Sequence, residues 1–200
     1  IKGTAPDYHV SVEEIKDIVK QVDIFFLDNP KSHLPNYFKN NEIDEILKCC
    51  VENNCILFLD EVYSGWETQT YLEHGKINDN LIVASGFSKV GFPCFKAGWL
   101  IASKDMKNIL ESNRSSYELN YFGCKGVEYI IDNIDYINSL KKSLMLTKKR
   151  WVSELRKSKI FTVYDSQNYV IRLYNNDRSL IQETYEKLKK EKVVVGVVDE

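Results

Sequence analysis

Two short segments of the sequence carry side chains that could act on one molecule. Asp60-Glu61-Val62-Tyr63 and Ser88-Lys89 place an acid and a lysine 29 positions apart, at Asp60 and Lys89. Each segment follows a continuous apolar run, at 56–59 and at 81–84. A lysine amine can form a Schiff base with a carbonyl compound, and a carboxylate can pair with a protonated pyridine nitrogen. An acid, a phenol and a lysine at the ends of neighbouring buried strands are what chemistry with pyridoxal phosphate (PLP) requires.

Short apolar runs alternate with helical patterns in the first half of the chain. Ser11 and Glu14 form a predicted capping box before apolar residues at helical spacing, and a second helical pattern runs from Ile43 to Cys50. The apolar runs that separate such patterns lie at 24–27, 56–59, 81–84 and 99–102. Continuous runs of this length indicate strands buried on both faces. We therefore expect an α/β fold with a mostly parallel sheet sandwiched by helices.

The pattern changes after Ser103. Helices are expected around 106–110, 127–134 and 137–155, and the clusters Lys141-Lys142 and Lys148-Lys149-Arg150 are interpreted as the solvated face of the longest one. Beyond Lys159 the sequence predicts a strand at 169–173, a helix at 180–188 and a second β-rich run at 193–195. We expect residues 1–158 to be part of a large cofactor-binding domain with an interdomain helix. Residues 159–200 would begin a small α+β domain.

Composition narrows the class of protein. The chain has 200 residues, 44% of them hydrophobic and 28% charged, with a formal net charge of −2. This balance indicates a globular protein and gives no reason to expect a nucleic acid or a membrane as partner. Five scattered cysteines indicate reduced thiols in a cytoplasmic protein, and three distant histidines suggest no metal site. The start, Ile1 to Thr4, suggests a segment of a longer chain.

Three polar segments follow predicted strands of the sheet. They lie at 28–30, 60–63 and 85–89. In an open parallel sheet, ligands bind beyond the carboxyl ends of the strands, so these segments should meet at one edge.

Residues 8–174 resemble fold-type I PLP-dependent aminotransferases of class I/II, above all the histidinol-phosphate aminotransferase-like branch. That branch also contains threonine-phosphate decarboxylase-like enzymes. Asp60-Glu61-Val62-Tyr63 resembles the family's Asp-Glu-Ala-Tyr, and residues 81–89 resemble its Schiff-base strand and loop. Gly98-Trp99 is similar to the Gly-aromatic pair that follows the phosphate-binding basic residue.

The resemblance implies a role for each matched residue. Lys89 would form the Schiff base with PLP and carry the substrate proton, and Asp60 would keep the pyridine nitrogen protonated. Tyr63 would donate a hydrogen bond to the cofactor's O3′, and Ser88 would help to bind its phosphate. The implied activity is transfer of an amino group between an amino acid and a keto acid or phosphorylated carbonyl compound, by a cytoplasmic homodimer. The alternatives are a PLP-dependent decarboxylase of a phosphorylated amino acid and a non-catalytic relative.

The sequence also departs from the family pattern. The phosphate-binding Arg is expected eight residues after Lys89, whereas the nearest basic residue here is Lys96, seven after it. A lysine keeps the charge but loses the bidentate geometry, so Lys96 is either a phosphate ligand or a solvated side chain. The residue that contacts O3′ is Asn29 on chemical grounds or Ser32 on spacing. Tyr117 and Asn120 fall where relatives have a loop near the partner subunit's active site.

Overall fold

A four-stranded sheet forms the centre of the fold. The computed structural model describes residue 3 and residues 8–75, 77–90, 92–115 and 118–197. The strand order is β1-β2-β3-β4, with β1, β2 and β3 parallel and β4 antiparallel to β3. The strands are β1 (Ile24–Asp28), β2 (Ile56–Asp60), β3 (Leu81–Gly86) and β4 (Gly98–Ala102). The predicted α/β class with a mostly parallel sheet is confirmed.

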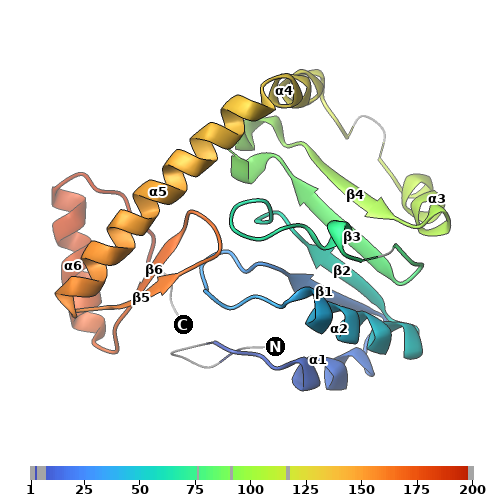
Figure 1. Ribbon diagram of the computed structural model, residues 1–200, viewed down its shortest axis with the longest axis horizontal. Helices are drawn as coiled ribbons and strands as arrows, with labels where there is room; N and C mark the ends of the chain where they lie inside the picture. The colour runs from blue at the N-terminus through green and yellow to red at the C-terminus, as the bar shows by residue number, and fades with distance from the viewer. Residues whose placement is uncertain (1–2, 4–7, 76, 91, 116–117, 198–200) are drawn as a thin grey trace.

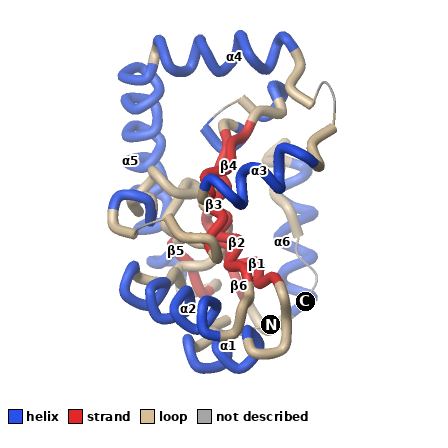
Figure 2. Tube along the Cα trace, turned by 90° about the vertical axis from the view of Figure 1, so that its right-hand side faces the viewer, coloured by secondary structure: helices blue, strands red, loops and turns tan. Residues whose placement is uncertain are grey.

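Two helices cover one face of this sheet. They are α1 (Val12–Val19) and α2 (Asn40–Glu52), and α1 begins with the predicted capping box, in which Glu14 N donates to Ser11 Oγ (3.2 Å) and Ser11 N donates to Glu14 Oε2 (2.8 Å). Figure 2 views the sheet on edge, with α1 and α2 near its β1 end and α4 across its β4 end. The fully buried side chains come from both helices and from the strands, among them Ile15, Ile43, Ile46, Leu57, Leu59, Leu81 and Val83.

In the described part of the chain, the opposite face of the sheet is exposed over β1 and β4, so the expectation of strands buried on both faces was wrong for these outer strands. Ile82 of the inner strand β3 also points to this face and is buried (5% exposed). Side chains alternate between the faces of a strand, and those that point away from α1 and α2 include Ile24, Phe26 and Leu100. These three are 47%, 69% and 50% exposed. A continuous apolar run in the sequence does not distinguish a strand covered on one face from a strand covered on both, because it does not show which elements pack on the strand.

A long helix leads away from the sheet. After α3 (Lys104–Ser112) and α4 (Tyr121–Asp132), the helix α5 (Ile134–Ser158) runs from α4 to a hairpin and a final helix (Figure 1). The hairpin pairs β5 (Thr162–Asp165) with β6 (Ile171–Tyr174), and α6 (Arg178–Lys190) follows. None of the described helices is long and apolar enough to cross a membrane.

The tail of the chain differs from the prediction in two places. The strand β5 was not predicted, because Thr162–Asp165 has only two apolar residues, Val163 and Tyr164, and shows no clear strand pattern. The prediction of β structure at 193–195 was wrong, since these residues form no strand and Val194 is 96% exposed. High β propensity produces a strand only where a partner strand is within reach.

The lysine clusters of α5 are not uniformly solvated. Lys148 is 3% exposed, and its Nζ lies 2.7 Å from Asp165 Oδ1 and donates to the backbone carbonyl of Ser166. Lys141 is half-buried, with its Nζ 5.2 Å from the centroid of the Trp66 ring. The prediction of a solvated face was therefore wrong for Lys148. Its helical position points toward the hairpin, where Asp165 supplies the compensating charge.

Candidate active site at the sheet edge

The sheet register brings the three polar segments to the same edge. Asp28 pairs with Asp60, and Asp60 pairs with Ala84, so the ends of β1, β2 and β3 lie level. Backbone hydrogen bonds continue this order beyond the strands: Asn29 N donates to Asp60 O (2.9 Å) and Glu61 N donates to Ala84 O (2.8 Å). Residues that follow the three strands therefore start from fixed, neighbouring positions.

Lys89 and Tyr63 meet at this edge. Lys89 lies in the single 3-10 turn η2 (Ser88–Val90) after β3, and its Nζ is 5.4 Å from the centroid of the Tyr63 ring. Both side chains are partly buried, as is Asp60, whose Oδ1 accepts a hydrogen bond from Val62 N (2.9 Å). An amine, a phenol and a carboxylate are thus held on adjacent strand ends by backbone hydrogen bonds.

Tyr169 extends this cluster and was not identified from the sequence as a site residue. Its ring centroid lies 6.2 Å from that of Tyr63 and 4.8 Å from that of Trp66. Burial raises the pKa of Tyr169 and the nearby Tyr63 raises it further, whereas the Lys89 ammonium opposes this shift. A tyrosine just before β6 gives no local signal that it will pack against a residue after β2.

Asn29 and Ser32, the two candidates for the O3′ contact, have different surroundings. Asn29 is buried, and its amide makes two hydrogen bonds to the backbone of Phe38: Nδ2 donates to the carbonyl (3.0 Å) and Oδ1 accepts from the N–H (2.7 Å). Ser32 is partly buried, and its Oγ lies 2.7 Å from His33 Nδ1. Burial lowers the pKa of His33, and the Arg172 guanidinium adds to this effect.

A buried asparagine fastens the loop that carries Ser32. Asn168 is fully buried, and its Nδ2 donates to the carbonyl oxygens of Ser32 (2.9 Å) and Lys31 (3.3 Å). Its Oδ1 accepts from Val170 N (2.9 Å), and Gln167 Nε2 donates to Pro35 O (3.4 Å). The segment before β6 therefore holds the loop at the end of β1 in place.

Ser88, Lys89 and Lys96 all belong to the connection between β3 and β4. Gly86 pairs with Gly98 at its base, and Phe87 N donates to Ala97 O (3.2 Å). A Cβ on Gly98 would lie 2.9 Å from Ser85 O, so the close pairing of the two strands requires glycine there. Ser88 is partly buried, whereas Lys96 is exposed and has a left-handed backbone (φ 50°).

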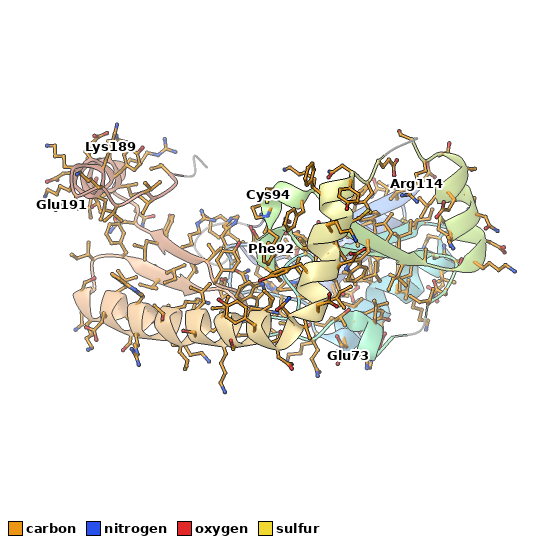
Figure 3. The ribbon with its side chains drawn as sticks, turned by 90° about the horizontal axis from the view of Figure 1, so that it is seen from above. Glu73, Phe92, Cys94, Arg114, Lys189 and Glu191 are labelled. Carbon is orange, nitrogen blue, oxygen red and sulfur yellow. The ribbon has the colours of Figure 1, made fainter. Side chains whose placement is uncertain are left out.

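Aromatic packing against α4 supports this connection. Phe92 stacks on Phe95 at 5.5 Å and meets Tyr129 of α4 at 6.3 Å. A Cβ on Gly126 would lie 2.2 Å from the Phe95 ring, so α4 can approach only because this residue is glycine. Figure 3 shows Phe92 and Cys94 beside α4. Two residues were expected from the sequence to lie near the partner subunit's active site. Of these, Asn120 caps α4 by accepting a hydrogen bond from Gly123 N (2.8 Å), and Tyr117 lies outside the described residues.

Glu61 is a second buried acid at this edge. It is 2% exposed, accepts a hydrogen bond from Tyr71 N (2.7 Å) and is also hydrogen-bonded by the Thr70 hydroxyl. Burial raises the pKa of Glu61, and the bond from Thr70 lowers it in part. Its carboxylate thus holds residues 70–71 against β2. The sequence Asp60-Glu61 alone does not show which of the two carboxylates is buried and holds the fold together.

Sequence comparison identifies relatives of this chain. The family described as aminotransferase class I and II matches residues 3–199. A histidinol-phosphate aminotransferase from Hydrogenobaculum sp. (strain Y04AAS1) is 27% identical over 170 residues, which cover 84% of this chain and 47% of the relative. The corresponding protein of Clostridium novyi (strain NT) is 23% identical over 189 residues, 91% of this chain and 51% of its own length. The chain spans about half the length of the curated relatives it matches.

Solved structures share the fold. The histidinol-phosphate aminotransferase of Sinorhizobium meliloti in complex with pyridoxal-5′-phosphate superposes with a TM-score of 0.81 at 16% identity, over 94% of this chain and 54% of that one. A decarboxylase from Sulfurospirillum multivorans gives 0.75 at 17% identity, over 92% and 55%. With the family match extending over residues 3–199, the chain belongs to the aminotransferases of class I and II.

Proposed function

We propose that the protein is a PLP-dependent aminotransferase. The observation that carries this proposal is the placement of Lys89 Nζ 5.4 Å from the Tyr63 ring, at the edge where Asp60 ends β2. An amine, a phenol and a carboxylate at the ends of two neighbouring strands are the donor set that PLP requires. The family membership and the relatives named histidinol-phosphate aminotransferase support the same activity.

Each residue of the set has a task in this proposal. Lys89 attaches the cofactor through Nζ and, once released, carries the proton of the substrate. Asp60 keeps the pyridine nitrogen protonated, and Tyr63 donates its hydroxyl proton to a hydrogen bond with O3′. When bound, PLP supplies an electron sink for the negative charge that develops on the substrate.

The remaining cofactor contacts are also proposals. Ser88 and Lys96 lie on the connection that carries Lys89, so both can serve the phosphate group. For O3′, Ser32 has its hydroxyl beside His33, whereas both ends of the Asn29 amide already bind the backbone of Phe38. This occupancy favours Ser32, since Asn29 retains only one unused amide hydrogen.

Reduction with borohydride tests the proposal. Protein mixed with PLP should show an absorption band of the lysine adduct, and sodium borohydride should fix PLP on the peptide that contains Lys89. Lys89→Ala should abolish both signals. Lys107→Ala, a matched change at an exposed lysine of α3, should leave them intact. If folded wild-type protein shows neither the absorption band nor fixed PLP, cofactor binding is refuted. The non-catalytic alternative predicts that negative result.

The second candidate is decarboxylation of a phosphorylated amino acid. It is favoured by the shared fold with the Sulfurospirillum multivorans decarboxylase and uses the same Lys89, Asp60 and Tyr63. The two reactions differ in what they consume. Transamination needs a keto acid or another carbonyl acceptor, whereas a decarboxylase would release carbon dioxide without one.

The organisation of the protein follows the family in this proposal. The hairpin β5–β6 with α6 would begin a small domain at residue 159, directly after α5 ends at Ser158. The protein would be a homodimer, and the exposure of Tyr121 (69%) and Phe122 (74%) on α4 supports a contact there. Light scattering of the purified protein tests the dimer. The cytoplasmic location rests on the five free cysteines.

A further inference from the structure

An open groove of about 350 Å³ lies between α5 and the loop that follows Tyr63. Its walls include Trp66 and Glu67 from the loop, and Asn138, Lys141, Lys142 and Lys149 from α5. The α5 residues recur at helical spacing, so they form one stripe that faces the loop. Between the groove and the Lys89 edge lie the rings of Tyr63, Tyr169 and Trp66, which contact one another in tilted pairs.

The charge of the groove is positive. Lys149 pairs with Glu67 at 2.9 Å, and in the described part of the chain neither Lys141 nor Lys142 forms an ion pair with a carboxylate. Lys141 is half-buried, and its Nζ rests over the Trp66 ring at 5.2 Å. Burial lowers the pKa of Lys141, because the ammonium group loses part of its contact with water. The nearest other acid on the hairpin, Asp165, pairs with Lys148.

Trp66, whose ring lies under the Lys141 ammonium, carries an unsatisfied donor. The indole Nε1 of Trp66 is buried and has no acceptor among the described residues. Buried N–H groups in folded proteins nearly always have an acceptor, so one is missing here. This N–H is itself buried, so the groups that an anion in the groove can reach are the ammonium groups of Lys141 and Lys142. Ammonium groups bind the oxygens of anions through charge-assisted hydrogen bonds.

We infer that this groove binds a small anion through a phosphate or carboxylate group, with Lys141 as its principal cation. This inference concerns a site apart from Lys89 and does not depend on PLP. Lys142 adds a second, solvated charge, and Glu67 keeps Lys149 turned toward the loop.

Calorimetric titration with inorganic phosphate tests the inference. The protein is first saturated with PLP so that phosphate cannot occupy a cofactor site, and a parallel titration with succinate distinguishes a carboxylate from a phosphate ligand. One saturable site is expected for at least one of the two anions. Lys141→Gln should weaken binding at least tenfold. Lys157→Gln, which removes an exposed lysine of the same helix that pairs with Glu154, should change it less than twofold.

The controls keep the inference open to refutation. The absence of saturable binding to wild-type protein with either anion would overturn it, as would equal losses in Lys141→Gln and Lys157→Gln. If Lys141→Gln does not fold by circular dichroism, Lys142→Gln replaces it, with an expected loss of at least threefold, and no loss would count against the site. If the protein does not bind PLP, the same titrations are run without it. Failure of the proposed function is then distinguishable from failure of this site.

Discussion

Asn168 donates a hydrogen bond from Nδ2 to the backbone carbonyl of Ser32 at 2.9 Å, across 136 positions of sequence. The segment before β6 thereby fixes the loop that follows β1. Loops that carry binding residues are otherwise the most mobile parts of a fold. A buried amide that satisfies two backbone carbonyls removes that freedom at this edge of the sheet.

The variant Asn168→Ala should lower the free energy of unfolding by about 2–4 kcal/mol, because it leaves the Ser32 carbonyl and Val170 N–H without their partner. Urea unfolding measures the loss. Asn108→Ala, at an exposed position of α3, should change stability by no more than about 0.5 kcal/mol. Equal effects of the two variants would contradict the role of Asn168.

Two adjacent lysines of α5 should respond very differently to removal. Lys148→Met should cost about 3 kcal/mol, since it leaves Asp165 and the Ser166 carbonyl without their buried cation. Lys149→Met breaks an ion pair whose lysine side chain is 61% exposed, so its cost should stay within about 1 kcal/mol. Thermal and urea unfolding of both variants check this difference. A cost for Lys149→Met that matches that of Lys148→Met would show that burial does not decide the outcome.

The hydroxyl of Tyr63 can be tested apart from its ring. Tyr63→Phe keeps the ring beneath Lys89 Nζ but removes the proposed donor to the cofactor's O3′. A donor stabilises the deprotonated form, so its loss should raise the pH midpoint of the PLP absorption band by about one to two units. Spectrophotometric titration measures the midpoint. Tyr136→Phe, at an exposed tyrosine of α5, should leave it unchanged, and an unmoved midpoint in Tyr63→Phe would exclude the contact.

Glu61 should make stability depend on pH. Burial raises its pKa above the ordinary value of 4.5, so the folded protein holds this proton more tightly than the unfolded chain does. Its contribution to stability is therefore lost as the pH rises from about 4.5 through the folded pKa. Glu61→Gln carries no such proton, so it should gain stability relative to wild type between pH 4 and pH 7.

Urea unfolding at pH 4, 5.5 and 7 measures this difference. Glu154→Gln, at a 67% exposed side chain, is the matched control and should show no such trend. A stability difference for Glu61→Gln that falls with rising pH would reverse the sign and contradict the assignment.

The elements around the sheet could be predicted because their signals are local. A run such as Ile56 to Leu59 and a capping box such as Ser11 to Glu14 each report a strand or a helix start from adjacent residues. Strand ends then place Asp60 and Lys89 at one edge without further information. The placement of Asn29, Ser32, Ser88 and Lys96 around a cofactor stays a prediction.

The features that could not be predicted depend on distant residues. Lys148 is buried only because Asp165 lies across from it on β5, and no pattern within α5 shows this. Tyr169 joins the site because the segment before β6 folds back on Tyr63 and Trp66. The exposure of Phe26 likewise depends on what packs against the far face of the sheet.

Gly86 pairs with Gly98 at the point where β3 and β4 enter their connecting loop, so changes within that loop need not alter the sheet. Phe87 N donates to Ala97 O one residue beyond that pairing, on the side of the loop. A residue gained or lost between Phe87 and Ala97 would therefore be accommodated in the loop without shifting β3 or β4. Lys89 and Lys96 leave from opposite sides of this closure. The number of residues between Lys89 and Lys96, the proposed attachment and phosphate-binding residues, can therefore change while Lys89 keeps its position after β3.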